Sequence, residues 1–317
     1  MTDHPDKSTR VPPAGVWAPA VTFFDPVTDE LDLESQAKYF NYLSQHLTGL
    51  VILGTNAETF LLTREERAQL VETARQAVGP GYPLMAASRA TPPSKSSNTC
   101  TTPTPRAPTT PSCSPAPTSA SRPPRTSSRP STPRSPPPPR CPSSSTTSPP
   151  SARVDLDSDT LAALARAHPA VVGVKLTCAS VGKITRLAAE FPPDVFAVYG
   201  GQSDFLLAGL SVGSAGCIAA FANVVPRTLR HIERLYRAGR HEEALRLQRV
   251  AADAEACCKA GVASTKFAVS LTSARSAGVE GAEERLGPRR PYVGVGEEVK
   301  EGIRRRMARV MVVEEGL

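Results

Sequence analysis

A lysine at the end of an apolar run is the residue of this sequence best suited to covalent chemistry. Lys175 follows Val171, Val172, Gly173 and Val174, a pattern that predicts a buried strand. A buried ammonium is costly, so burial lowers the pKa of a lysine. The neutral amine is the nucleophile that forms a Schiff base with a ketone. The alternative is a lysine whose side chain reaches solvent.

Two polar turns also follow apolar runs. The turn Gly54-Thr55-Asn56-Ala57-Glu58 comes directly after one of them. Its backbone N–H groups and its small hydroxyl and amide side chains could hold a carboxylate. An ordinary turn between strand and loop is the alternative. The second turn, 200–204, begins with two glycines but lacks the G-x-G-x-x-G spacing of a phosphate-binding loop. The seven cysteines include no C-x-x-C pair, so we expect no metal site.

Short apolar runs alternate with helical patterns on both sides of residues 89–153. The runs that predict strands are 16–24, 48–54, 83–87, 170–176, 195–199 and 215–220. The helical patterns are 32–43, 63 onward, 159–166, 181–190, 226–238 and 241–260. Continuously apolar strands between helices indicate an α/β fold with a parallel sheet. With strands from the middle of the chain, we expect a (β/α)8 TIM barrel with a C-terminal helical extension, whose functional residues lie at the carboxyl ends of its strands.

Residues 89–153 interrupt this pattern. They hold 19 of the 32 prolines, eight arginines, one lysine and no acid, a formal charge of +9 against +7 for the whole chain. The rest of the chain therefore carries −2, so the net positive charge of the whole chain comes from this segment. Because the segment contains no Val, Ile, Leu, Met, Phe, Tyr, Trp or Gly, as printed it cannot bury enough apolar surface to fold, and we expect it to be disordered.

The small set of amino acids used in residues 89–153 also indicates a wrong-frame translation. Ala, Pro, Thr and most Ser codons share C at the second base. A shift by one base turns such Ser codons into Phe, Leu, Ile or Val, and Thr codons into Tyr, His, Asn or Asp. Applied to residues 143–149, the shift permits an apolar strand that ends in Tyr-Asn-x-Pro. We therefore interpret residues 89–153 as the middle of a barrel read in the wrong frame.

Several of these motifs, in this order, resemble the dihydrodipicolinate synthase / N-acetylneuraminate lyase family. The turn 54–58 resembles the turn with which that family binds the carboxylate of pyruvate, and Gly173-Val174-Lys175 resembles its Schiff-base strand. Gly201 matches the glycine that begins the loop after strand 7. Ile218 matches a residue that lines the pyruvate site. The resemblance covers roughly residues 14–88 and 154–317.

The resemblance implies a class I (Schiff-base) lyase or aldolase that acts on pyruvate or a related 2-oxo acid. Lys175 would form the Schiff base, and Thr55 and Asn56 would bind the carboxylate. The Thr-Asn pair looks more like the 4-hydroxy-2-oxoglutarate aldolase branch than the Thr-Thr synthases, and Ala57 stands where the family usually has Gly. This chemistry requires no organic cofactor and no metal. The resemblance also suggests a homotetramer.

The family takes its proton relay from a tyrosine in a Tyr-Asn-x-Pro strand end. Residues 89–153 contain no tyrosine. The shifted frame would put the relay where Thr146 is printed. It would put a second family tyrosine, often donated across the subunit interface, where Thr118 is printed. The printed chain therefore lacks the relay.

Two other interpretations remain open from the sequence. One is a catalytically dead family member or mistranslated product with no enzymatic role. The other is a nucleic-acid binder that uses the Arg-rich segment, which lacks aromatic residues for base stacking. We expect neither a nucleic-acid nor a membrane partner. Acids occur within the first seven residues, without an apolar leader, and this predicts a cytoplasmic protein.

The patterns divide the chain into five parts. We expect a flexible N-terminus over 1–13, a first part of the barrel over 14–88, and the wrong-frame or disordered segment over 89–153. A second part of the barrel follows over 154–235, and a C-terminal helical region over 236–317.

Overall fold

The computed structural model describes residues 11–87, 155–168 and 170–317. The strand end predicted at residues 143–149, and the whole of 89–153, lie outside these described residues. Within the described residues, regular secondary structure begins with a strand at Gly15 and ends with a helix at Glu315.

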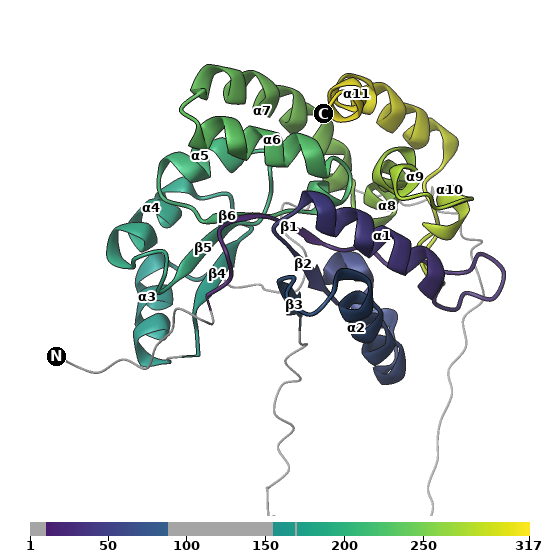
Figure 1. Cartoon of the computed structure of the whole chain (residues 1–317), viewed down its shortest axis with the longest axis horizontal. Helices are drawn as coiled ribbons and strands as arrows, with labels where there is room; N and C mark the ends of the chain where they lie inside the picture. Colours follow the sequence, from purple (N-terminus) through teal and green to yellow (C-terminus); the bar gives the residue numbers. More distant parts are fainter. Residues whose placement is uncertain (1–10, 88–154, 169) are drawn as a thin grey trace, which may run out of the picture. The chain divides into compact units, whose positions relative to one another are not determined.

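Six short strands form one parallel sheet. They are β1 (Gly15–Pro19), β2 (Gly49–Ile52), β3 (Leu84–Ala86), β4 (Gly173–Leu176), β5 (Ala197–Gly200) and β6 (Gly216–Ile218). The sheet order is β3-β2-β1-β6-β5-β4 (Figure 1). The last strand thus pairs with the first, with Val16 opposite Cys217. Its two end strands, β3 and β4, are those on either side of the undescribed residues 88–154.

Side chains alternate between the two faces of these strands, as the pleat requires. On one face, Val174 and Leu176 of β4 pack against α3 (Ser158–Ala167) and α4 (Val181–Glu190). The other face holds a separate buried cluster to which most strands contribute. Its members are Trp17, Ala197, Tyr199, Ala215 and Ile218, with Val11, Val51 and Met85 packed against them. The sheet therefore encloses an apolar interior and turns its opposite face to the helices.

Helices flank the sheet in the order that the sequence predicts. α1 (Leu33–His46) and α2 (Arg64–Val78) accompany β1 to β3, while α3 and α4 accompany β4 and β5 (Figure 1). The remaining helices are α5 (Leu206–Ser211), α6 (Pro226–Arg237), α7 (His241–Glu255), α8 (Val262–Leu271), α9 (Ser273–Ser276), α10 (Ala282–Arg285) and α11 (Glu297–Glu315). Short 3-10 turns are η1 (Thr55–Ala57), η2 (Thr59–Leu61), η3 (Ala220–Asn223) and η4 (Ala256–Ala260).

The pattern Thr63-Arg64-Glu65-Glu66 predicts a capping box at the start of α2, and the structure confirms it. Glu66 N–H donates to Thr63 Oγ1 at 3.2 Å, and Thr63 N–H donates to Glu66 Oε2 at 2.7 Å. These two bonds satisfy two of the orphan donors at the helix start. The predicted helix over 181–190 also matches α4 at both ends.

Some predicted elements are shorter in the structure. The apolar run 16–24 forms a strand only to Pro19, and Phe24 instead makes an antiparallel bridge to Leu31. The predicted helix over 241–260 ends at Glu255 and continues as η4. Apolar runs report burial, and residues 16–24 are buried throughout, both within the strand and beyond its end. Burial alone does not say where the strand or α-helix ends.

Pro12 and Pro13, near the start of the described residues, are held by side chains of the interior cluster. Tyr199 Oη lies 2.8 Å from the carbonyl oxygens of both Pro12 and Pro13, and Trp17 Nε1 donates to Pro13 O at 3.0 Å. Pro12 and Pro13 are thus held by the sheet, although the sequence predicted a flexible terminus up to residue 13.

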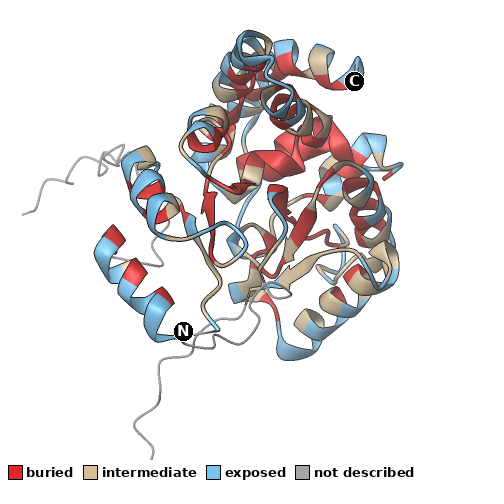
Figure 2. Ribbon diagram, turned by 60° about the vertical axis from the view of Figure 1, so that its left-hand side comes forward, coloured by how far each residue is buried: buried red, intermediate tan, exposed pale blue. Residues whose placement is uncertain are grey.

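The C-terminal helices pack on one another and on the end of the sheet. Residues 264–271 of α8 are buried throughout (Figure 2). In α11, Glu314 accepts hydrogen bonds from the backbone N–H groups of Arg227 (3.0 Å) and Thr228 (2.7 Å), the first turn of α6. A carboxylate there satisfies orphan helix donors. Among the helices of the described residues, none has the length and apolar character needed to cross a membrane.

Candidate active site

Lys175 lies on the interior face of β4. It is opposite Tyr199 in the β4–β5 register, and Tyr199 belongs to the interior cluster. Its neighbours Val174 and Leu176 point the other way, toward the helices. Desolvation by the surrounding protein lowers the pKa of the Lys175 ammonium from its usual 10.5. The residue is nevertheless open to solvent among the described residues, so the desolvation is partial. The pKa shift has the direction expected for a lysine on a buried strand, although the residue itself is exposed.

Thr55 and Asn56 lie in η1, directly after β2. Thr55 is exposed and Asn56 is half-buried, so both can reach a small solute. The turn is tied to the segment that follows β1 by Thr22, whose Oγ1 donates to Ala57 O at 2.9 Å. Gly54 packs on Pro19, the last residue of β1. The two predicted carboxylate-binding residues therefore sit at the carboxyl ends of β1 and β2.

Gly201 lies against the chain that leaves Lys175. Its N–H donates to Leu176 O at 2.8 Å. A Cβ on Gly201 would lie 2.6 Å from Thr177 Cα, which no real Cβ contact allows. Only glycine therefore permits the loops after β4 and β5 to approach so closely. Gln202 strengthens the contact, since its Nε2 donates to Thr177 O at 3.1 Å.

Ile218 ends β6 and belongs to the interior cluster. It is opposite Trp17 in the β1–β6 register and is 7% exposed. Lys175, Gly201 and Ile218 thus come from three neighbouring strands at one end of a parallel sheet, the end that also carries η1. Functional residues of α/β barrels gather at this end. We expect a small ligand between them to contact the Lys175 amine, the polar turn η1 and the apolar side chain of Ile218.

The structure adds three polar groups whose roles the sequence did not predict. Asn223 is fully buried and its Nδ2 donates to Pro19 O at 2.9 Å, which fixes the end of β1. Glu58, the last residue of the η1 motif, forms a buried ion pair with Lys266. Glu255 binds the loop after β5. The three polar residues are visible in the sequence, but their burial and their partners are not.

Glu255 holds the loop that contains Gly201. Its carboxylate accepts from Ser203 N–H at 3.0 Å and from Ser203 Oγ at 2.6 Å. Gln248 adds a second anchor, since its Nε2 donates to Ser203 O at 2.9 Å. Burial raises the pKa of Glu255 from 4.5 to about 7, and the Ser203 hydrogen bonds oppose that rise. The loop beside Lys175 is therefore held by a carboxyl group that titrates near neutral pH.

This shift predicts a pH dependence of stability. Because the folded-state pKa of Glu255 is raised, the folded protein retains a proton that the unfolded chain loses above pH 4.5. The stabilisation is present below that pH and is lost as pH rises to about 7. At about 1.4 kcal/mol per pKa unit, the loss is about 3 kcal/mol. Urea unfolding at pH 4 and pH 8 measures it. The Glu255→Gln variant should not show this loss, and equal pH slopes for both proteins would refute the assignment.

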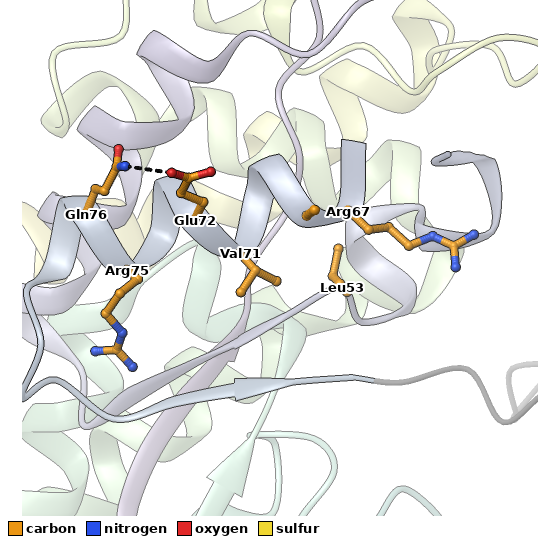
Figure 3. A pocket seen from close by; sticks show the side chains of 7 residues that line it. Leu53, Arg67, Val71, Glu72, Arg75 and Gln76 are labelled. Carbon is orange, nitrogen blue, oxygen red and sulfur yellow. Dashed lines mark hydrogen bonds between the residues drawn. The ribbon is translucent and has the colours of Figure 1, made fainter. Parts of the chain in front are cut away.

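A pocket of about 670 Å³ lies elsewhere, beside α2. Leu53, Val71 and the stems of Arg67 and Arg75 line it (Figure 3). Its wall is almost entirely apolar. It includes none of Lys175, Gly201, Ile218 or the η1 residues, so it is not the site assembled above. Among the described residues, no group of three or more His, Cys, Asp or Glu side chains is placed to hold a metal ion.

A parallel sheet whose last strand pairs with its first and whose outer face is covered by helices is typical of α/β barrel proteins. The sequence profile of the dihydrodipicolinate synthetase family matches residues 147–308. A Coccidioides immitis protein named as a mitochondrial 4-hydroxy-2-oxoglutarate aldolase is 51% identical over 310 residues, which cover 97% of this chain and 99% of the relative. The chain belongs to the dihydrodipicolinate synthetase family, and the resemblance drawn from its motifs is confirmed.

Two further similarities agree with this assignment. An Emericella nidulans protein, also named as a mitochondrial 4-hydroxy-2-oxoglutarate aldolase, is 31% identical and is covered to 89%, against 88% of this chain. A crystal structure of a dihydrodipicolinate synthase family protein from Coccidioides immitis superposes with a TM-score of 0.76 at 44% identity, covering 97% of this chain and 99% of that one. The relatives are named as aldolases, so the chain is a member of an enzyme family of lyases.

The prediction of a cytoplasmic protein is wrong. Both of these named relatives are described as mitochondrial. The prediction was based on a few acidic residues near the start of the sequence, and so short a stretch is a weak guide to a protein's destination.

Proposed function

We propose that this protein is a class I aldolase that forms a Schiff base between Lys175 and a small 2-oxo acid, in the manner of a 4-hydroxy-2-oxoglutarate aldolase. The observation that carries this proposal is Lys175 itself, on the interior face of β4 with a pKa lowered by desolvation. A lowered pKa increases the fraction of neutral amine at physiological pH. The 51% identity to a protein named as such an aldolase supports the choice of reaction class.

In the proposed reaction, the Lys175 amine attacks the ketone carbon of the 2-oxo acid, and water leaves as the iminium forms. The 4-hydroxyl of the substrate then loses its proton to water, the bond between C3 and C4 breaks, C4 leaves as an aldehyde, and the iminium takes up the electron pair as an enamine. Protonation of the enamine at carbon and hydrolysis of the resulting iminium release the product 2-oxo acid and the free Lys175 amine. Thr55 and Asn56 bind the carboxylate, while Gly201 and Ile218 shape the space beside the lysine. Neither a metal nor an organic cofactor takes part. The partner is a small molecule, and the protein itself is a homo-oligomer.

The direct test is reduction of the imine. Incubation with pyruvate and borohydride should add the mass of reduced pyruvate to one peptide, the one that contains Lys175. Labelling of another lysine, or of none, would refute the proposal. The non-catalytic alternative predicts no adduct at all.

The proposed role of Thr55 predicts a change in affinity. Removing the hydroxyl in Thr55→Val should raise KM for the 2-oxo acid about tenfold, the effect of one lost hydrogen bond to a charged group. The value of kcat should change little, because the carboxylate is held equally in ground and transition states. Steady-state kinetics measures both. Thr59→Val, in the adjoining turn η2, is the matched control. An equal KM in both variants would exclude Thr55 from carboxylate binding.

We also propose that residues 14–88 and 154–235 are two parts of one (β/α)8 barrel, with 236–317 as its C-terminal helical region. The six described strands run from β3 round to β4, so two more strands between these ends would complete eight. The 65 residues 89–153 have the length of two β/α units of about 30 residues each. The apolar pocket beside α2 in Figure 3 lies next to the end strand β3, where a further unit would pack.

The relatives support the wrong-frame interpretation of residues 89–153. The Coccidioides immitis relative is matched over 99% of its length by 97% of this chain. The segment therefore takes the place of an equally long stretch in the relative. A disordered insertion would instead have made this chain longer than the relative.

A further inference from the structure

The Glu58 side chain links the carboxylate-binding turn to the C-terminal helices. Its carboxylate is 2% exposed. Oε1 accepts from Lys266 Nζ in α8 at 2.7 Å, and Oε2 accepts from the Arg289 backbone N–H at 2.8 Å. Both oxygens are therefore engaged by residues more than 200 positions away in the chain.

Lys266 is equally enclosed. Its side chain has no exposed surface, and its Nζ also donates to Gly287 O at 2.9 Å and lies 4.7 Å from the centre of the Phe24 ring. Burial lowers the pKa of Lys266, and the Glu58 carboxylate opposes this effect. A fully buried ammonium persists only with such partners. Both charged groups of the ion pair therefore have hydrogen-bond partners, and they keep these partners in only one conformation of the turn.

Arg289 holds the other end of the same stretch. Its guanidinium binds both carboxylate oxygens of Glu66, with distances of 2.8 Å and 2.7 Å, in the capping box of α2. Its own backbone N–H binds Glu58. The segment 287–289 therefore contacts the chain at two places, just before η2 and at the start of α2. We call Glu58, Lys266 and Arg289 the turn clamp.

The turn needs an external restraint. Leu53 and Glu58, which bracket η1, both have positive φ angles, 65° and 54°, although neither is glycine. Such conformations persist at functional sites only when the surrounding structure enforces them. Glu58 is both one of these strained residues and the residue whose side chain the clamp holds. The clamp therefore acts on the backbone that positions Thr55 and Asn56.

We infer that the turn clamp is a positioning device: through Glu58, α8 and the segment 287–289 set the geometry of Thr55 and Asn56 and thereby the affinity for the substrate carboxylate. This inference rests on the proposed function for its second half. The alternative is a purely stabilising ion pair, and buried ion pairs often add little net stability.

Two variants test the clamp against a matched control. Glu58→Gln removes the charge, and the double variant Glu58→Gln with Lys266→Met leaves no unpaired charge buried, so it protects the fold. The control is Glu314→Gln, which removes another buried carboxylate that binds two backbone N–H groups, at the start of α6. Amide hydrogen exchange is measured on the full chain, together with the pyruvate dependence of borohydride trapping.

Both clamp variants should speed exchange over residues 54–61 about tenfold and raise the half-saturating pyruvate concentration about tenfold, with the maximal trapping rate unchanged. Glu314→Gln should speed exchange over 226–235 alone. Unchanged exchange over 54–61 in the clamp variants would overturn the positioning role. Faster exchange with unchanged half-saturation would overturn its link to the carboxylate. If the unmodified chain traps no pyruvate, the proposed function fails, and exchange alone decides whether the clamp positions the turn.

Discussion

Replacing Lys175 should abolish both the trapped adduct and turnover. Lys175→Met removes the nucleophile, and Lys175→Arg keeps the positive charge but offers no neutral amine at accessible pH. We expect kcat/KM to fall at least about a thousandfold in both, as for other nucleophiles removed from enzymes. Binding of the 2-oxo acid should persist, since Thr55 and Asn56 remain. The measurements are intact-protein mass after borohydride reduction, steady-state kinetics and calorimetric binding of pyruvate.

Lys38→Met is the control for these variants. Lys38 lies on α1 with a half-exposed side chain and forms an ion pair with Glu34 on the same helix. Its loss should leave both trapping and turnover unchanged. If Lys175→Met still formed the adduct, another lysine would be the nucleophile, and the candidate site would be wrong. Lys266 would be the next to consider, because its pKa is also lowered, but its side chain is fully buried and its amine is already bound by Glu58.

Restoring the shifted reading frame across codons 89–153 should have the second large effect. The frame would supply the tyrosine relay at position 146 and the two strands between β3 and β4. A positioned general acid–base contributes about 10²- to 10⁴-fold. We therefore expect the restored protein to turn over substrate at least about a hundredfold faster than the printed chain. Both proteins retain Lys175, so any adduct on the printed chain should form without efficient turnover.

Thermal stability should also rise when the reading frame is restored. Among the described residues, β3 and β4 are the end strands of the sheet, and an apolar wall lies beside α2; in a closed barrel, further strands and helices would cover them. We expect the restored protein to melt cooperatively and at higher temperature. Replacing the restored tyrosine at position 146 by phenylalanine should remove the gain in turnover and keep the gain in stability. This separates the relay from the closure of the barrel.

The transcript decides which chain the cell makes. A transcript that encodes an apolar strand ending in Tyr-Asn-x-Pro over 143–149 would make the restored protein the natural one. A transcript that confirms the printed frame, together with a cooperative high-temperature melt of that chain, would contradict the wrong-frame interpretation.

The sequence by itself determined the fold class and the candidate residues, because the relevant signals are local. The alternation of apolar runs and helical patterns predicted the parallel sheet, and the capping box at Thr63 and Glu66 predicted the start of α2. Lys175 and the 54–58 turn were identified from a few neighbouring residues each. The anomalous composition of 89–153 was likewise visible without any structure.

Only the tertiary structure decided how these residues are held. Lys175 is paired with Tyr199 of the interior cluster, and a continuously apolar run does not show which face of its strand is interior. The Glu58–Lys266 pair joins residues 208 positions apart, and Ser203–Glu255 joins residues 52 apart. A charged residue in an apolar stretch shows that a partner must exist. The partner itself is chosen by the packing of distant helices, and this is why the turn clamp and the Glu255 anchor could be found only in three dimensions.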